Sequence, residues 1–134
     1  MQSALARAAN AYQQTHVQSR SPLELVVMLY DGALRFIGDA KAAIGRKDLG
    51  AKREAISRAL AIISELQSTL NVQDGGEIAT SLDGIYGYIN QQLIEANIQG
   101  TTAPLDESER LLGTLRGAWA DIASRPEPAT GTGR

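Results

Sequence analysis

The chain has 134 residues, of which 43% are hydrophobic, and a formal net charge of −2. This length suits one domain, which buries about two thirds of the surface that its unfolded chain exposes. Because cysteine is absent, disulfides, thiolate metal sites and cysteine nucleophiles are excluded. Lys and Arg are scattered, and their densest group is Arg46, Lys47, Lys52 and Arg53. We interpret this group as solvated charge at a helix junction, not as a nucleic-acid-binding patch.

The hydropathy pattern indicates neither membrane insertion nor secretion. No apolar run approaches the ~20 residues that a membrane-spanning helix needs. The first sixteen residues, MQSALARAANAYQQTH, lack the uninterrupted apolar stretch of a signal peptide. We therefore expect a cytoplasmic protein.

Apolar residues recur at helical spacing along the chain, without the alternation typical of strands. A first helix is expected from about Ser3 to His16, although its alanine-rich apolar stripe is too thin to hold a helix in isolation. A second helix is expected over Ser21 to Ile44. At its start Ser21 can cap the free amides, and Glu24 completes an S-x-x-E capping box. Pro22 suits the first helical position, where its missing N–H costs nothing.

This second helix is apolar over a wider arc than one core contact requires. Its main stripe consists of Leu23, Val26, Val27, Tyr30, Ala33, Leu34, Ile37, Ala40 and Ile44. Beside it lies a second lobe made of Leu25, Leu29, Phe36 and Ala43. Together they span roughly 200° of the helix, more than the ~3/7 face that a bundle helix buries. The second lobe therefore predicts a further partner, inside the chain or outside it.

Three more amphipathic helices of about twenty residues complete the pattern. They are expected at about Ala51–Val72, Glu77–Gln99 and Leu105–Ala123, with turns or loops at residues 45–50, 74–76 and 100–104. Short connections favour antiparallel neighbours, so residues 21–123 are predicted to form an all-α, antiparallel four-helix bundle. Residues 1–20 would add a short N-terminal helix and a connector. The Pro-, Gly- and Thr-rich tail of residues 124–134 is expected to be disordered.

Residues suited to catalysis are sparse. His16 is the only histidine, and it lies at the weak end of the first helix, not inside a long helix as in a phosphotransfer bundle. A di-iron bundle would need two Glu-x-x-His motifs, which one histidine excludes. Carboxylates such as Asp83, Glu95 and Asp106 fall on polar faces or near helix starts, where they offset the helix dipole. We expect no enzyme activity, and phosphotransfer through His16 remains the catalytic alternative.

The four tyrosines are Tyr12, Tyr30, Tyr86 and Tyr88. Tyrosine suits a surface that a partner covers part of the time, because it offers apolar area while its hydroxyl stays solvated. Tyr86 and Tyr88 cannot share one helix face. For Tyr30 and Tyr86, partner contact and half-burial at a bundle seam both stay open. For Tyr12 and Tyr88 we favour partner contact.

Two motifs are distinctive, Met28–Ala33, MLYDGA, followed by Gly75–Ala79, GGEIA. Together they resemble motifs of the flagellin export chaperone family, FliS. Weaker matches in the same order are Ala11–Tyr12 with Val17, Ser21–Leu25, Ile62–Leu66, Glu95–Asn97 and Leu115–Trp119. The resemblance thus covers the chain from about Ala11 to Ile122. Gly117 departs from it, since the family often has a charged residue there.

The resemblance implies a cytoplasmic helical-bundle chaperone that binds the C-terminal segment of newly made flagellin and prevents premature polymerisation. It also implies delivery to the flagellar export gate, with docking that involves the region of Tyr12, and use of neither ATP nor a cofactor. Our candidate partner-binding residues are Tyr12, Leu25, Leu29, Tyr30, Phe36, Tyr86 and Tyr88. The alternative is a self-associating helical adaptor without flagellin cargo, whose homodimer buries the second lobe.

The N-terminal helix and the second lobe suggest a sharper hypothesis. The helix around Leu5 to Tyr12 could lie over Leu25, Leu29 and Phe36 in the free protein, and cargo would then displace it. A fifth helix packed permanently on the bundle is the other interpretation.

Overall fold

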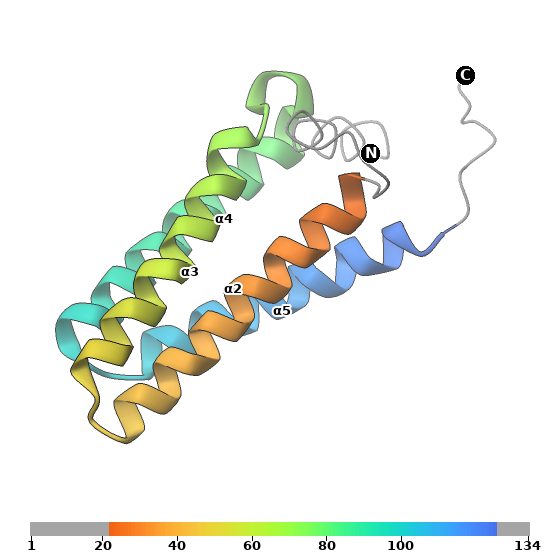
Figure 1. The fold of residues 1–134 in the computed structure, drawn as a ribbon. Helices are drawn as coiled ribbons and strands as arrows, with labels where there is room; N and C mark the ends of the chain where they lie inside the picture. Colours follow the sequence, from red (N-terminus) through yellow and green to blue (C-terminus); the bar gives the residue numbers. More distant parts are fainter. Residues whose placement is uncertain (1–21, 126–134) are drawn as a thin grey trace, which may run out of the picture.

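The computed structural model describes residues 22–125, which form four α-helices (Figure 1). They are α2 (Pro22–Gly45), α3 (Leu49–Thr69), α4 (Val72–Gln99) and α5 (Ala103–Ala123). Residues 22–125 contain no strand, so the predicted all-α helical bundle is confirmed. The expected N-terminal helix, the Ser21 cap and most of the tail lie outside the described residues.

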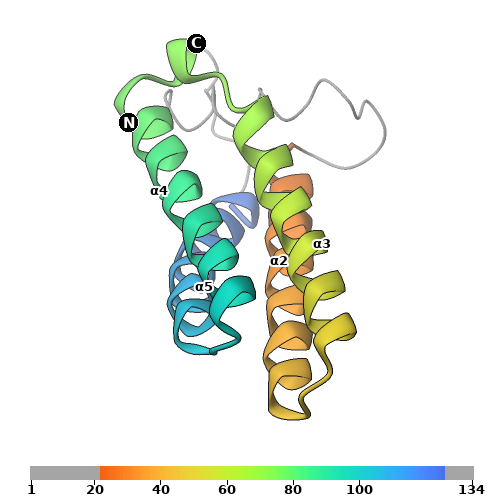
Figure 2. The ribbon, with the colours of Figure 1, turned by 90° about the vertical axis from the view of Figure 1, so that its left-hand side faces the viewer.

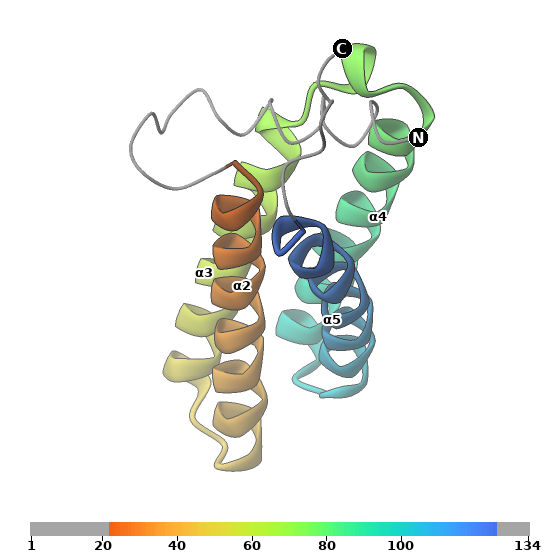
Figure 3. The same cartoon turned by 90° about the vertical axis from the view of Figure 1, so that its right-hand side faces the viewer.

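Each helix packs mainly against two others. α2 contacts α3 and α5, and α4 contacts the same two helices from the other side of the core. Figures 2 and 3, which face opposite sides of the molecule, show α2 beside α3 and α4 beside α5. α2 and α4 are therefore diagonal across the bundle, and their outer faces point in opposite directions.

Three helix boundaries differ from those expected. α3 begins at Leu49, two residues early, since the side chain of Asp48 accepts a hydrogen bond from the Ala51 amide at 3.1 Å. It ends at Thr69, three residues before Val72, because Leu70 has an extended backbone with φ −75° and ψ 122°. The start of α5 also comes earlier, at Ala103, with Pro104 in its first turn.

Glycine at positive φ accounts for the ends of α4. Gly100 has φ 68° and ends the helix where expected. The predicted turn at residues 74–76 is instead a kink, since a helical turn begins at Val72 and breaks at Gly76, with φ 64° and ψ −142°. The long continuous part of α4 then follows to Gln99, as expected.

Lys52 corrects the interpretation of the basic group as solvated charge. Its side chain is buried, and its Nζ donates to the backbone carbonyl of Asn97 at 2.9 Å. A cation at this point satisfies a carbonyl in the last turn of α4 and opposes the negative end of the helix dipole. Arg46, Lys47 and Arg53 are exposed, as expected.

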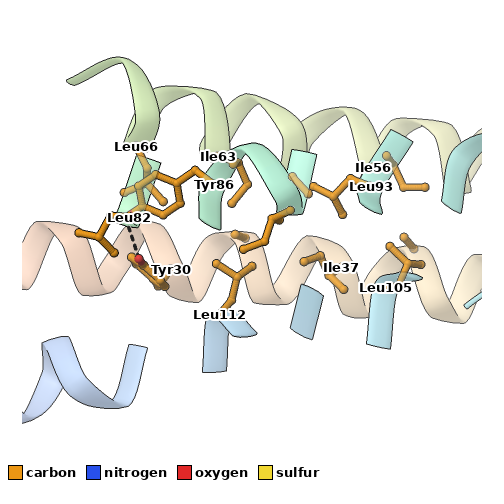
Figure 4. Packing of buried hydrophobic residues seen from close by; sticks show 14 of the residues in the cluster. Tyr30, Ile37, Ile56, Ile63, Leu66, Leu82, Tyr86, Leu93, Leu105 and Leu112 are labelled. Atoms are coloured by element: carbon orange, nitrogen blue, oxygen red, sulfur yellow. Dashed lines mark hydrogen bonds between the residues drawn. The ribbon is translucent and has the colours of Figure 1, made fainter. Parts of the chain in front are cut away.

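The core is mainly aliphatic and draws on all four helices (Figure 4). Alanines at Ala33, Ala40, Ala55 and Ala59 are fully or almost fully buried, so α2 and α3 approach closely. At Gly32 the approach is tighter still, because a Cβ there would lie 3.1 Å from Cδ1 of Ile62. Close packing along this seam holds the second lobe of α2 against α3.

Candidate partner-binding surface

Within the MLYDGA segment, Tyr30 forms a buried pair with Tyr86 of α4. The hydroxyls of Tyr30 and Tyr86 lie 2.7 Å apart, and neither residue is exposed to solvent (Figure 4). Burial raises the pKa of Tyr30 to about 12, while hydrogen bonds with Tyr86 and Trp119 partly oppose that rise. Since Trp119 is also buried, side chains from α2, α4 and α5 meet around this hydroxyl.

The next two residues of the motif complete its contacts. Asp31 accepts two hydrogen bonds from the guanidinium of Arg116 on α5, with Nε–Oδ1 2.8 Å and Nη2–Oδ2 3.2 Å. Gly32 allows the close approach of Ile62 on α3. Three successive residues thus contact all three other helices, and the motif accounts for assembly of the bundle.

Burial separates two of the candidate residues from any surface. Tyr30 and Tyr86 are fully buried, so neither is a half-buried residue at a bundle seam. In this conformation they position α2 against α4, and a partner does not reach them. Tyr12 and His16 lie outside the described residues.

The second lobe is partly covered by α3. Ala43 is buried, whereas Leu25, Leu29 and Phe36 are partly exposed. Leu29 and Phe36 pack against the core, and Gly32, which shares their face of α2, contacts α3. The wide apolar arc is therefore explained in part by two neighbouring helices, and its outer edge remains exposed.

Met28 enlarges that exposed edge. It is 49% exposed and lies one turn from Leu25 and next to Leu29. Met28 belongs to neither of the two apolar stripes predicted for this helix. We name the partly exposed strip formed by Leu25, Met28, Leu29 and Phe36 the α2/α3 surface.

A shallow depression of about 290 Å³ continues this surface toward the α2–α3 connection. It is lined by Phe36, Asp39, Ala42 and Arg46 from α2 and by Ala51, Glu54, Ala55 and Arg58 from α3. The guanidinium carbons of Arg35 and Arg58 lie 5.1 and 5.8 Å from the centroid of the Phe36 ring. Alanines and one aromatic ring thus form an apolar floor, and charges of both signs surround it.

Tyr88 lies away from these residues. It is 44% exposed on α4, beside Arg110 of α5. The pKa of Arg110 is raised above its ordinary value, mainly by its hydrogen bond with Glu107. Because α2 and α4 are diagonal, Tyr88 cannot join the α2/α3 surface in one small contact.

Comparison with known proteins gives consistent matches over most of the chain. A family model described as "Flagellar protein FliS" matches residues 5–126. The chain is 36% identical to the flagellar secretion chaperone FliS of Salmonella typhimurium over 113 residues, or 84% of each chain. It is 39% identical to that of Bacillus subtilis over 124 residues, or 92% of each chain. Against that of Campylobacter jejuni, identity is 37% over 115 residues, covering 86% of this chain and 90% of the relative.

Membrane insertion gains no support from the described helices. Along residues 22–125, none has the length and apolar content that crossing a membrane requires.

Proposed function

The chain belongs to the FliS family of flagellar secretion chaperones, and on that basis we propose that it is a cytoplasmic chaperone for flagellin. It binds the C-terminal segment of flagellin, prevents premature polymerisation and assists delivery to the flagellar export gate. The observation that supports this role best is the α2/α3 surface, a strip of apolar side chains that the bundle leaves partly uncovered.

The shape of the strip suits a helical ligand. Leu25, Met28, Leu29 and Phe36 follow one edge of α2 over eleven positions, which is about 16 Å of helix. An amphipathic helix of about three turns can lay its apolar stripe along such an edge. The depression beside Phe36 has room for one further apolar side chain, and the charges around it can pair with polar residues of the ligand.

The energetics favour a long bound segment. A fully buried apolar side chain contributes ~1.5–3 kcal/mol, and the side chains here are already partly covered. Ordering each cargo residue costs ~1–2 kcal/mol of backbone entropy. Useful affinity therefore requires many weak contacts along an extended segment, and this moderate affinity permits release at export.

The N-terminal segment has two roles in this proposal. The helix around Leu5 to Tyr12 covers the second lobe in the free protein and leaves it when cargo binds, and Tyr12 contributes to docking at the export gate. Deleting residues 1–16 should leave a folded bundle whose affinity for a flagellin C-terminal peptide is no weaker. A clear loss of affinity would contradict displacement.

A peptide titration followed by circular dichroism tests the proposed cargo. Helical signal should rise beyond the sum of the two components, because the flagellin segment folds when it binds. Light scattering at several chain concentrations, with and without peptide, separates this function from the self-associating adaptor. Absence of binding at micromolar peptide, together with a stable dimer, would favour the adaptor.

A further inference from the structure

The outer face of α4 carries exposed apolar side chains away from the α2/α3 surface. Five large hydrophobic residues in the described part of the chain are exposed, and three of them, Tyr88, Ile94 and Ile98, belong to α4. Ile94 and Ile98 are 48% and 75% exposed and lie one turn apart. A helix that faces water is usually polar on that side, so these three residues require an explanation.

Gly84 lies on this face of α4, one turn before Tyr88. A Cβ added at Gly84 would meet no atom within 4 Å, so no packing contact inside the bundle requires glycine there. Glycine inside a helix costs roughly 0.5–1 kcal/mol relative to alanine. Its effect is to let an incoming chain approach the backbone of α4 beside Tyr88.

The charged residues that α4 itself contributes are all acidic. α4 contains four acidic residues and no Lys or Arg. Residues 70–125 carry eight acidic and three basic residues, a net charge of −5, whereas residues 22–69 carry six acidic and seven basic, a net charge of +1. Within the described part of the chain, Glu77 and Glu95 form none of the ion pairs, and Glu95 accepts a hydrogen bond from Gln99. Three of the four acidic residues of α5 pair with bases on α2 or α5, and the fourth, Asp121, pairs with Arg125 just beyond the end of the helix.

We propose that the outer face of α4, formed by Glu77, Gly84, Tyr88, Ile94, Glu95 and Ile98, docks a basic amphipathic helix of another protein. The apolar side chains receive the partner's apolar stripe, and the carboxylates receive the Lys or Arg residues that flank it. From Glu77 to Ile98 the face is about 31 Å long, which matches a partner helix of about twenty residues. Because α2 and α4 are diagonal, this partner and a ligand on the α2/α3 surface can bind together.

Charge selects this occupant over two others. A second copy joined through the same face would bring Glu77 and Glu95 close to their equivalents, and like charges oppose that contact. The chain's own first twenty-one residues, with Arg7 and Arg20 as their only Lys or Arg, are assigned to the α2/α3 surface in the proposed function. A separate basic helix satisfies both the apolar and the acidic parts of the face.

Two synthetic twenty-residue helical peptides test the proposal with the full chain. Both carry the same leucine stripe, and one has lysines where the other has glutamates. Calorimetric titration should give binding of the lysine peptide that is about tenfold or more tighter than that of the glutamate peptide, and weaker at high salt. In NMR spectra of the full chain, the lysine peptide should shift the amide resonances of residues 84–98.

Matched variants distinguish docking of the peptide on the α4 face from a general electrostatic attraction of a basic peptide to the chain. Ile98→Ser should weaken the lysine peptide about tenfold, while Met28→Ser on α2 should not. Glu95→Gln should weaken it about two- to fivefold, and Glu65→Gln on α3 should leave it unchanged. All four side chains are on helix surfaces, so the variants fold, which thermal unfolding verifies.

Four results would overturn the proposal. The first two are equal binding of the two peptides and amide resonance shifts confined to α2. The third is self-association of the chain that Ile98→Ser abolishes. The fourth is tighter peptide binding after deletion of residues 1–21, which would show that the chain covers its own α4 face. The proposal does not depend on flagellin as cargo. If a flagellin C-terminal peptide fails to bind, only the proposed function is refuted. If that peptide binds and shifts the amide resonances of residues 84–98, the proposal that a separate partner occupies the α4 face is refuted.

Discussion

The buried hydroxyl pair of Tyr30 and Tyr86 gives the sharpest stability prediction. Tyr30→Phe removes the hydroxyl that bonds to Tyr86 and also interacts with Trp119. A buried hydrogen bond contributes about 0.5–1.5 kcal/mol to stability, so Tyr30→Phe should cost about that much. Tyr86→Phe removes the same hydrogen bond and should cost a similar amount. The double variant should lose little more than Tyr30→Phe alone, since both halves of the pair are gone.

The pH dependence of stability provides a second measure of the same pair. The pKa of Tyr30 rises from its ordinary value of 10.0 to about 12 on folding, because burial disfavours the phenolate. A raised pKa means that the stabilising contribution is complete below pH 10 and is lost as pH rises from 10 toward 12. Where only the unfolded chain ionises, stability falls by about 1.4 kcal/mol per pH unit for this group.

Urea unfolding of the wild type and Tyr30→Phe at pH 8, 10 and 11 measures both effects. The wild type should be more stable at pH 8, and the difference should narrow at pH 11, because phenylalanine does not ionise. Two results would refute the reasoning. The first is equal stability of the wild type and Tyr30→Phe at pH 8, which would show that the buried hydroxyl bond contributes nothing. The second is a stability difference between them that does not change with pH, which would show that folding does not protect Tyr30 from ionisation.

Three further predictions concern packing, charge and capping. Gly32→Val should lower stability by about 1–3 kcal/mol, because the added side chain collides with Ile62. Gly113→Ala meets open space and should raise stability by about 0.5–1 kcal/mol. Thermal unfolding measures both variants, and a stability change of the same sign in both would contradict the close packing of α2 on α3. Lys41→Gln should lower the melting temperature at low salt, because Lys41 pairs with two carboxylates of α5 at 2.8 Å, and a loss that persists at 1 M salt would argue against an electrostatic cause. Asp48→Ala should cost about 0.5–2 kcal/mol through loss of the α3 cap, and unchanged urea unfolding would show that the cap contributes nothing.

Local sequence patterns predicted the helices well where one residue determines a boundary. Pro22 at the start of α2 and Gly100 after α4 could both be identified because their backbone preferences act locally. Asp48 could have been identified as well, since it is a preferred capping residue directly before a helix. Its place inside a segment interpreted as a break led to the late start assigned to α3.

Contacts between distant residues could not be predicted in this way. Tyr30 and Tyr86 are 56 residues apart, and nothing in helical periodicity pairs one tyrosine with the other. The same applies to Lys52, whose carbonyl partner is on α4. Periodicity also gave the width of the apolar arc on α2 but not which neighbour covers it, because core and surface contacts both require apolar residues.

Calorimetric titration with a flagellin C-terminal peptide tests the central claim most directly, with Met28→Glu and Leu49→Glu compared with the wild type. Both residues are exposed apolar side chains, 49% and 60% exposed, but only Met28 belongs to the α2/α3 surface. Met28→Glu should weaken binding by about tenfold or more, because it places a charge in an apolar contact, and Leu49→Glu should bind like the wild type. Equal affinity of the two variants would contradict the assignment of the α2/α3 surface as the flagellin site.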